Sequence, residues 1–202
     1  MASSDGGMRG PRWLSLEALD RLVSAMDVQV IALSECVVGP GCALDLGGCD
    51  TPSFHYIREG HGRLYTPGGI PADVEPQTLI IVPPHCPFRF EPASPASPEP
   101  AGATVFILCG RFRSLCGDSI DLFDTLNAPI AEQFSGDDGL EPILQLALAE
   151  HISGGICSDV LVSSAMKQVL IALIRRAVLS LKGWTRRFVV LQVSDHPSNR
   201  AS

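Results

Sequence analysis

The chain has 202 residues, of which 46% are hydrophobic and 18% are charged. This composition supports a packed core in about one domain and excludes a disordered chain. The formal net charge is −7, and an acidic chain does not by itself bind nucleic-acid phosphates.

The cysteines and the N-terminal residues narrow the class of protein further. The seven cysteines are scattered, without the C-x-x-C pair that a zinc finger would show or the tight pairing of a disulfide framework. Several lie in apolar segments, where free cysteine packs as a small hydrophobe, and this usage predicts a reducing cytoplasm. Residues 1–12 lack the apolar core of a signal peptide, and we expect them to be disordered.

The first predicted elements are a helix and then a series of strands. Four apolar side chains at helical spacing predict a helix over residues 14–26. From residue 28 to residue 112, short apolar runs alternate with Gly and Pro clusters. These runs predict strands over residues 28–33, 53–58, 62–66, 79–82, 87–90 and 104–112. Gly60 and Gly62 mark a tight turn, and many short strands with such turn signals predict a sandwich or barrel.

The second half of the chain predicts helices. The prolines of residues 92–100 exclude a helix there, and we expect this segment to be a surface insertion between two strands. After Gly117 we expect a short helix over 119–126, a helix with an apolar face from Leu140 to His151, and a long helix capped by Ser158 and ending near Leu181. Another helix is predicted over 184–192, followed by a frayed tail over 193–202.

The apolar stripe of the long helix is wide, so this helix should be sandwiched. Either it packs between the barrel and another helix, or it lies across a dimer interface. Lys167, Gln168, Arg175 and Arg176 interrupt its apolar run, and we therefore expect no membrane-spanning helix.

Four pieces of the chain, in this order, resemble the N-terminal cupin-like sensor domain of AraC-type transcription regulators. They are the helix that begins at Trp13-Leu14, the strand Phe54-His55-Tyr56-Ile57 with its Glu59-Gly60 turn, the strand that ends at Val82-Pro83-Pro84, and the segment Leu108-Cys109-Gly110-Arg111-Phe112. The helical stretch that ends at Gly183–Phe188 also resembles the exit from that sensor. The match extends over about residues 13–192.

The resemblance implies a mainly β fold with α-helices. Its core would be a cupin-like double-stranded β-helix, or jelly-roll barrel, over residues 13–117 with the N-terminal helix. A helical packing and dimerisation segment would follow over residues 118–192. In such regulators two helix-turn-helix units follow the sensor, and the chain ends at Ser202, about where they would begin. DNA contact is therefore expected only through a domain absent from this chain.

The resemblance also bears on metal binding. Metal-dependent cupins place histidines and a glutamate on facing strands. If the Glu59-Gly60 turn aligns with the family, Ser53, His55 and Ile57 point inward, because strand side chains alternate. Ser53 then stands where enzymes keep a metal ligand, and Phe88 stands where a later histidine is expected. We expect no metal and no other cofactor at the family positions, while a different set using His55, His61, His85 or a cysteine stays open.

The predicted ligand-binding residues are His55, Ile57, His85, Phe88 and Arg111. His55 could bond a ligand inside the barrel or be satisfied by a backbone carbonyl. His85 could be a contact at the barrel rim or a turn histidine without a role. Arg111 lies in an apolar strand and needs a carboxylate partner or an anionic ligand, and we expect a structural ion pair.

Three functions remain open at this point. The leading hypothesis is an effector-binding and dimerisation domain that responds to a small molecule and is not an enzyme. The chain has no Gly-x-Ser-x-Gly, phosphate-loop, Gly-x-Gly-x-x-Gly or His-Glu-x-x-His motif and no predicted catalytic residue. The alternative is a stand-alone metal-dependent cupin enzyme, an oxygenase or isomerase. The third is a domain that only packs and dimerises, with its barrel filled by Phe54, Phe88, Phe90 and Phe106.

Overall fold

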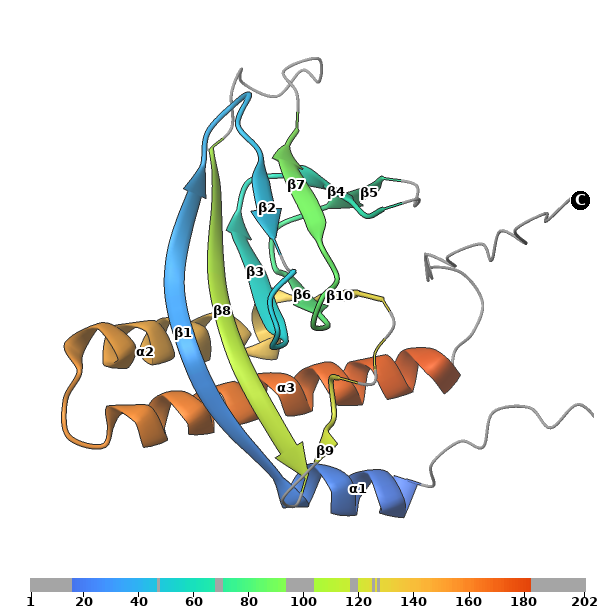
Figure 1. Ribbon diagram of the computed structural model, residues 1–202, viewed down its shortest axis with the longest axis vertical. Coiled ribbons are helices and arrows are strands. Elements are labelled where there is room, and N and C mark those ends of the chain that lie inside the picture. The colour runs from blue at the N-terminus through green and yellow to red at the C-terminus, as the bar shows by residue number, and fades with distance from the viewer. Residues whose placement is uncertain are drawn as a thin grey trace, which may run out of the picture.

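The computed structural model describes residues 16–46, 48–67, 71–93, 104–116, 120–124, 126 and 128–182. The predictions for residues 1–12, for most of the proline-rich insertion and for residues 183–202 lie outside this part of the chain. The elements are α1 Leu16–Ala25, β1 Met26–Val38, β2 Leu44–Leu46, β3 Ser53–Glu59, β4 Gly62–Tyr65, β5 Ala72–Val74, β6 Thr78–Val82, β7 Phe88–Pro92, β8 Val105–Cys116, β9 Ile120–Asp121, β10 Ile130–Gln133, the 3₁₀ helix η1 Gly136–Asp138, α2 Leu140–Ser153 and α3 Ser158–Lys182. Figure 1 shows their arrangement.

The strands form two antiparallel sheets. One sheet has the order β1-β8-β3-β6-β10, with β9 paired to β8, and the other has the order β2-β7-β4-β5. Consecutive strands cross between the sheets, since β3 lies in the first sheet and β4 in the second. This arrangement is the jelly-roll barrel followed by helices that the sequence analysis predicted.

Strand β3 separates two hydrophobic cores. Ile57 packs into the space between the two sheets, together with Ile107 of β8 and Phe90 of β7. Phe54 and Tyr56 point to the opposite side of the sheet, into a core that includes the helices. Five consecutive residues of β3 are therefore buried, with alternate side chains in different cores.

Helices α2 and α3 cover the outer face of the larger sheet. They contact each other, and Figure 1 shows them side by side as they cross the long strands β1 and β8. The buried face of α3 consists of Val162, Ala165, Met166, Val169, Leu170 and Leu173. Packing of the long helix between the sheet and a second helix is thus confirmed, whereas Leu161 of its predicted stripe is exposed. No helix in the described part of the chain is long and apolar enough to cross a membrane.

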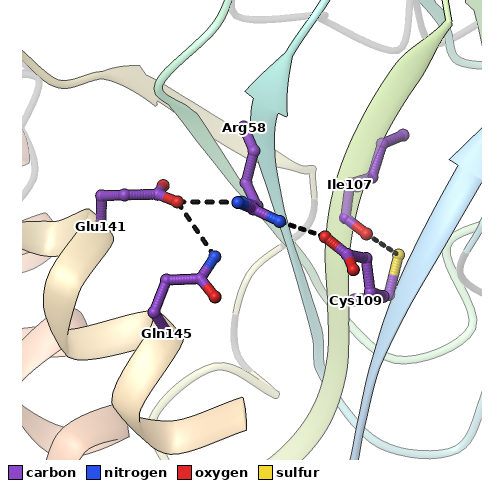
Figure 2. A network of polar contacts seen from close by, with 6 residues as sticks. Arg58, Ile107, Cys109, Glu141 and Gln145 are labelled. Carbon is purple, nitrogen blue, oxygen red and sulfur yellow. Dashed lines mark hydrogen bonds and ion pairs between the residues drawn. The ribbon is translucent and has the colours of Figure 1, made fainter. Parts of the chain in front are cut away.

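Polar contacts also join the sheet to α2. Arg58 of β3 donates from Nε to the Glu141 carboxylate at 2.9 Å and from Nη1 to the Glu35 carboxylate of β1 (Figure 2). Gln145, one turn along α2, donates to the same Glu141 oxygen at 3.0 Å. One guanidinium therefore connects two strands and a helix.

The prediction of a short helix over 119–126 was wrong for the described residues. Ile120–Asp121 forms strand β9, and the following Ile130–Gln133 forms strand β10 beside β6. The cause is the buried Asp121 carboxylate, which accepts hydrogen bonds from the Ser114 backbone N–H at 2.9 Å and the Ser114 hydroxyl at 3.0 Å. These bonds hold the chain against β8, so the segment 118–192 begins with strands of the barrel sheet. The short strands β2 and β5 were also missed.

The two glycines of the β3–β4 turn have different roles. Gly60 has φ +85°, in the left-handed region that favours glycine, as the turn prediction requires. Gly62 is required for a steric reason instead. A Cβ at this position would overlap the Phe90 ring and the Glu91 carbonyl oxygen of the neighbouring strand.

We expect Gly62→Ala to lower the free energy of unfolding by about 1–3 kcal/mol, the usual cost of overpacking a core. The measurement is the urea midpoint of unfolding. Gly39→Ala is the matched control, because a Cβ there has no heavy atom within 4 Å. Equal midpoints for the two variants would contradict the packing role of Gly62.

Candidate ligand-binding site

His55 lies between the two sheets, as the alternation of β3 predicted. Its side chain is only 4% exposed. Its Nε2 is 3.0 Å from the Ser53 hydroxyl oxygen. The ring packs edge-on against Phe88 of the facing sheet, with 5.4 Å between ring centroids and 75° between ring planes. The partner of His55 is thus a hydroxyl rather than a backbone carbonyl.

Burial determines the charge of His55. Desolvation lowers the pKa of the imidazole from 6.5 to about 3, so the ring is neutral at physiological pH. Its Nδ1 is buried and has no hydrogen-bond partner among the described residues. A neutral imidazole with one free nitrogen can donate to or accept from one polar group of a ligand.

A pocket of about 390 Å³ lies where β2 and β4 end and β7 begins. We call it the mouth pocket. Its walls are Asp45, Leu46, Tyr65, Thr66, Pro67, Pro87, Phe88 and Arg89. Phe88 lines the mouth pocket and its ring also contacts His55, so this residue belongs both to the pocket wall and to the barrel interior.

Polar groups are present on the wall of the mouth pocket. The Thr66 hydroxyl is buried and has no partner among the described residues. Arg89 also lines the pocket, and its Nε donates to Glu91 at 2.8 Å. A concave, mainly apolar surface with a few polar groups is typical of a small-molecule site.

The structure brings together some of the predicted site residues and separates others. His55, Ile57 and Phe88 share the space between the sheets. His85 is exposed in a turn with φ +57°, and its backbone N–H donates to the Cys49 carbonyl at 2.7 Å. Of the five predicted residues, Phe88 lines the mouth pocket, whereas His55, Ile57, His85 and Arg111 do not.

The expected ion pair of Arg111 is absent among the described residues. Arg111 stands opposite Ser53 on β8, but its side chain is exposed. The reason for the difference is that β8 continues to Cys116, beyond the part of the strand that the second sheet covers. Water solvates the guanidinium there, so it needs no carboxylate.

The pocket residues that the sequence analysis missed come from strand ends. Leu46 belongs to the undetected strand β2, while Tyr65 and Thr66 lie at the end of β4. No motif marks them. Only the sheet order β2-β7-β4, which places Leu46 opposite Phe88 and Tyr65 opposite Arg89, brings them together.

The donor set around His55 does not fit a metal ion. Within the described ranges, no three His, Cys, Asp or Glu side chains are placed to hold one. The side chains in contact with the His55 ring include the Ser53 hydroxyl and the Phe88 ring, a poor ligand and a non-ligand. The third hypothesis required a barrel filled by four phenylalanines. Phe88 and Phe90 do lie between the sheets, whereas Phe54 lies on the helix side and Phe106 is only half-buried.

Several solved structures are similar to this chain. The apo form of a point variant of ToxT from Vibrio cholerae is 10% identical, with a TM-score of 0.47, and the match covers 71% of this chain and 56% of that one. Unsaturated fatty acid-bound wild-type ToxT from the same organism is 8% identical, with a TM-score of 0.47 and coverage of 75% and 55%. YhaK from Escherichia coli is 10% identical, with a TM-score of 0.38 and coverage of 54% and 44%. The chain thus spans about half the length of these structures.

The family comparison covers most of the chain. No curated protein matches it. A model of the cupin family matches residues 17–178, which include both sheets and most of α3. The chain therefore belongs to the cupin family, in the form found as the N-terminal domain of AraC-type regulators.

Proposed function

We propose that this chain is the effector-binding and dimerisation domain of an AraC-type transcription regulator in the cytoplasm. A small molecule occupies the mouth pocket, and DNA contact is made by a helix-turn-helix part that these 202 residues do not contain. The observation that carries the proposal is the 390 Å³ pocket whose wall residue Phe88 contacts the buried His55.

The chemistry of the site favours binding over catalysis. A cupin metalloenzyme needs several nitrogen and oxygen ligands directed at one point, and His55 has no such companions among the described residues. The neutral, desolvated imidazole is suited to one directional hydrogen bond with an uncharged or anionic ligand. The rival function, a metal-dependent oxygenase or isomerase, would require ligands from outside the described residues.

A physical route connects the mouth pocket with the helices. A ligand that displaces Phe88 acts on His55, which belongs to β3. Tyr56, the next residue, faces the helices, and burial together with Glu141 of α2 raises the pKa of its hydroxyl. Arg58 of the same strand is bonded to Glu141 at 2.9 Å. A shift of β3 is therefore transmitted to α2, and a ligand that prefers one position of β3 shifts the equilibrium between two arrangements.

The α2–α3 hairpin provides the surface for dimerisation. Its exposed apolar residues, which we call the α2–α3 patch, are Leu146, Ile152, Ile156, Val160 and Leu161. Ile156, in the turn between the helices, is 97% exposed. Apolar side chains gathered at one end of a hairpin mark a protein–protein contact, and a second copy of the chain covers them in our proposal.

The effector proposal is tested with the fluorescent probe 8-anilinonaphthalene-1-sulfonate, an anionic aromatic molecule that matches the apolar wall and Arg89 of the mouth pocket. We expect one probe to bind per chain. Pro67→Trp should weaken this binding about tenfold or more by filling the pocket, a loss of about 1.4 kcal/mol. The measurement is a fluorescence titration.

Gln168→Trp is the matched control for that titration, since Gln168 is an exposed residue of α3 on the other side of the larger sheet. It should leave probe binding unchanged. Equal probe affinity in both tryptophan variants would contradict the assignment of the pocket. One transition metal per purified chain, released in His55→Ala, would instead support the enzyme.

The burial of His55 predicts a specific pH dependence of stability. The unfolded chain takes up a proton on this histidine near pH 6.5, while the folded chain does so only near pH 3. Between these values the unfolded state binds more protons, so the free energy of unfolding falls with falling pH, by at most about 1.4 kcal/mol per pH unit. His55→Leu should flatten this slope in urea titrations between pH 6.5 and pH 3.

The effect of His55 is taken as the difference in slope between wild type and variant, because the titration of Glu132 changes the free energy of unfolding in the opposite direction. Burial raises the pKa of the Glu132 carboxyl above 4.5, so this group favours the folded state at low pH. Val37→Leu, which removes no titrating group and lies at a position that is 59% exposed, is the control and should keep the wild-type slope. If wild type and His55→Leu have the same slope, the histidine is not held neutral by the fold.

The dimer proposal predicts that Ile156→Asp combined with Val160→Asp raises the dimer dissociation constant about a hundredfold or more, since two charges would be buried in an apolar contact. Sedimentation equilibrium measures the effect. Val37→Asp changes an apolar residue of β1 that is 59% exposed and lies outside the α2–α3 patch. If Val37→Asp dissociates the dimer and the double variant does not, the interface lies at the edge strand β1 and this proposal is wrong.

A further inference from the structure

Two cysteines of neighbouring strands lie on the barrel side of the larger sheet. Cys109 of β8 belongs to the core between the sheets, and Cys36 of β1 packs against that core. In the register of β1 with β8, Cys36 stands opposite Ile107 and Cys109 stands opposite Ser34. The two cysteines are thus diagonal neighbours on one face of the sheet.

The two neighbouring thiols have different environments. A hydrogen bond between them lowers the pKa of Cys36 from 9.0 to about 6, and the same bond with burial raises that of Cys109. Burial and the Glu35 charge oppose this lowering, whereas a hydrogen bond with Ser34 adds to it. The thiolate form is therefore favoured on Cys36 over Cys109.

Access to the two sulfur atoms also differs. Cys36 is half-buried, on the strand at the edge of the sheet, whereas Cys109 is 9% exposed. In Figure 2, the Cys109 thiol is directed toward the backbone oxygen of Ile107 in its own strand, at 4.0 Å. Both cysteines are free thiols in this structure. An accessible thiolate next to a buried thiol is the arrangement of a nucleophile and a resolving group.

We propose that Cys36 and Cys109 form a redox site that reacts with low-molecular-weight disulfides, with Cys36 as the nucleophile and Cys109 as the resolving thiol. The Cys36 thiolate attacks one sulfur of the disulfide RS–SR. The Cys36–SR bond forms, the RS–SR bond breaks, and the leaving RS⁻ takes a proton from water. Cys109 then loses its proton to solvent and attacks the Cys36 sulfur, which forms the Cys36–Cys109 bond and releases the second RS⁻.

The reaction balances without another reagent. Two protein thiols are oxidised to one disulfide, and one RS–SR is reduced to two RSH. Neither cysteine lines the mouth pocket, so this site is separate from the proposed effector site. Failure of one proposal therefore leaves the other standing.

The experiment exposes the full chain to oxidised glutathione, blocks the remaining thiols by alkylation at acidic pH, and maps peptide masses. We expect wild type to contain a Cys36–Cys109 disulfide. In Cys109→Ala, glutathione should remain attached to Cys36, and in Cys36→Ala, Cys109 should stay unmodified. Cys157→Ala, which removes an exposed thiol far from the pair in sequence, should behave like wild type.

Two results would overturn the proposal. One is a Cys36 that stays free while the exposed Cys42 or Cys157 takes up glutathione. The other is wild-type protein that accumulates glutathione on Cys36 without forming the Cys36–Cys109 bond. Because the wild-type linkage is itself a readout, the test stands even if a cysteine variant folds poorly, which circular dichroism at each stage would reveal.

Discussion

The fold depends on a strand with both faces buried. In β3, Phe54 and Tyr56 contact the helices, while Ser53, His55 and Ile57 face the second sheet. A shift of register by one residue would exchange the two sets, placing a histidine against α2 and α3 and an aromatic pair inside the barrel. The alternation of residues 53–57 therefore fixes both the barrel and the position of the helices.

The same constraint explains why a polar group lies in the barrel. His55 cannot turn toward solvent without moving its neighbours in β3, so it is desolvated, neutral and bonded to Ser53. Its second nitrogen has no partner among the described residues, and such a group is costly to bury. In the proposed function, a ligand that displaces Phe88 would supply the missing bond and gain free energy from it.

The sequence was sufficient where local rules decide and insufficient where tertiary contacts decide. The inward position of His55 follows from alternation, and the turn at Gly60 follows from its positive φ. In contrast, β9 forms because Asp121 bonds Ser114 across the sheet, which no local pattern indicates. The mouth pocket combines ends of three strands, and the solvation of Arg111 depends on where the second sheet stops, so neither could be predicted from periodicity.

The position of β1 in the sheet explains the different exposure of the two thiols. This strand is an edge, bonded to β8 on one side, so a side chain such as Cys36 remains partly accessible. Strand β8 has partners on both sides, and Cys109 is consequently buried opposite His55 of β3. A neutral histidine there adds no charge that would draw the proton away from Cys109. In our proposal the sheet order therefore assigns the more accessible Cys36 to attack and the buried Cys109 to resolve.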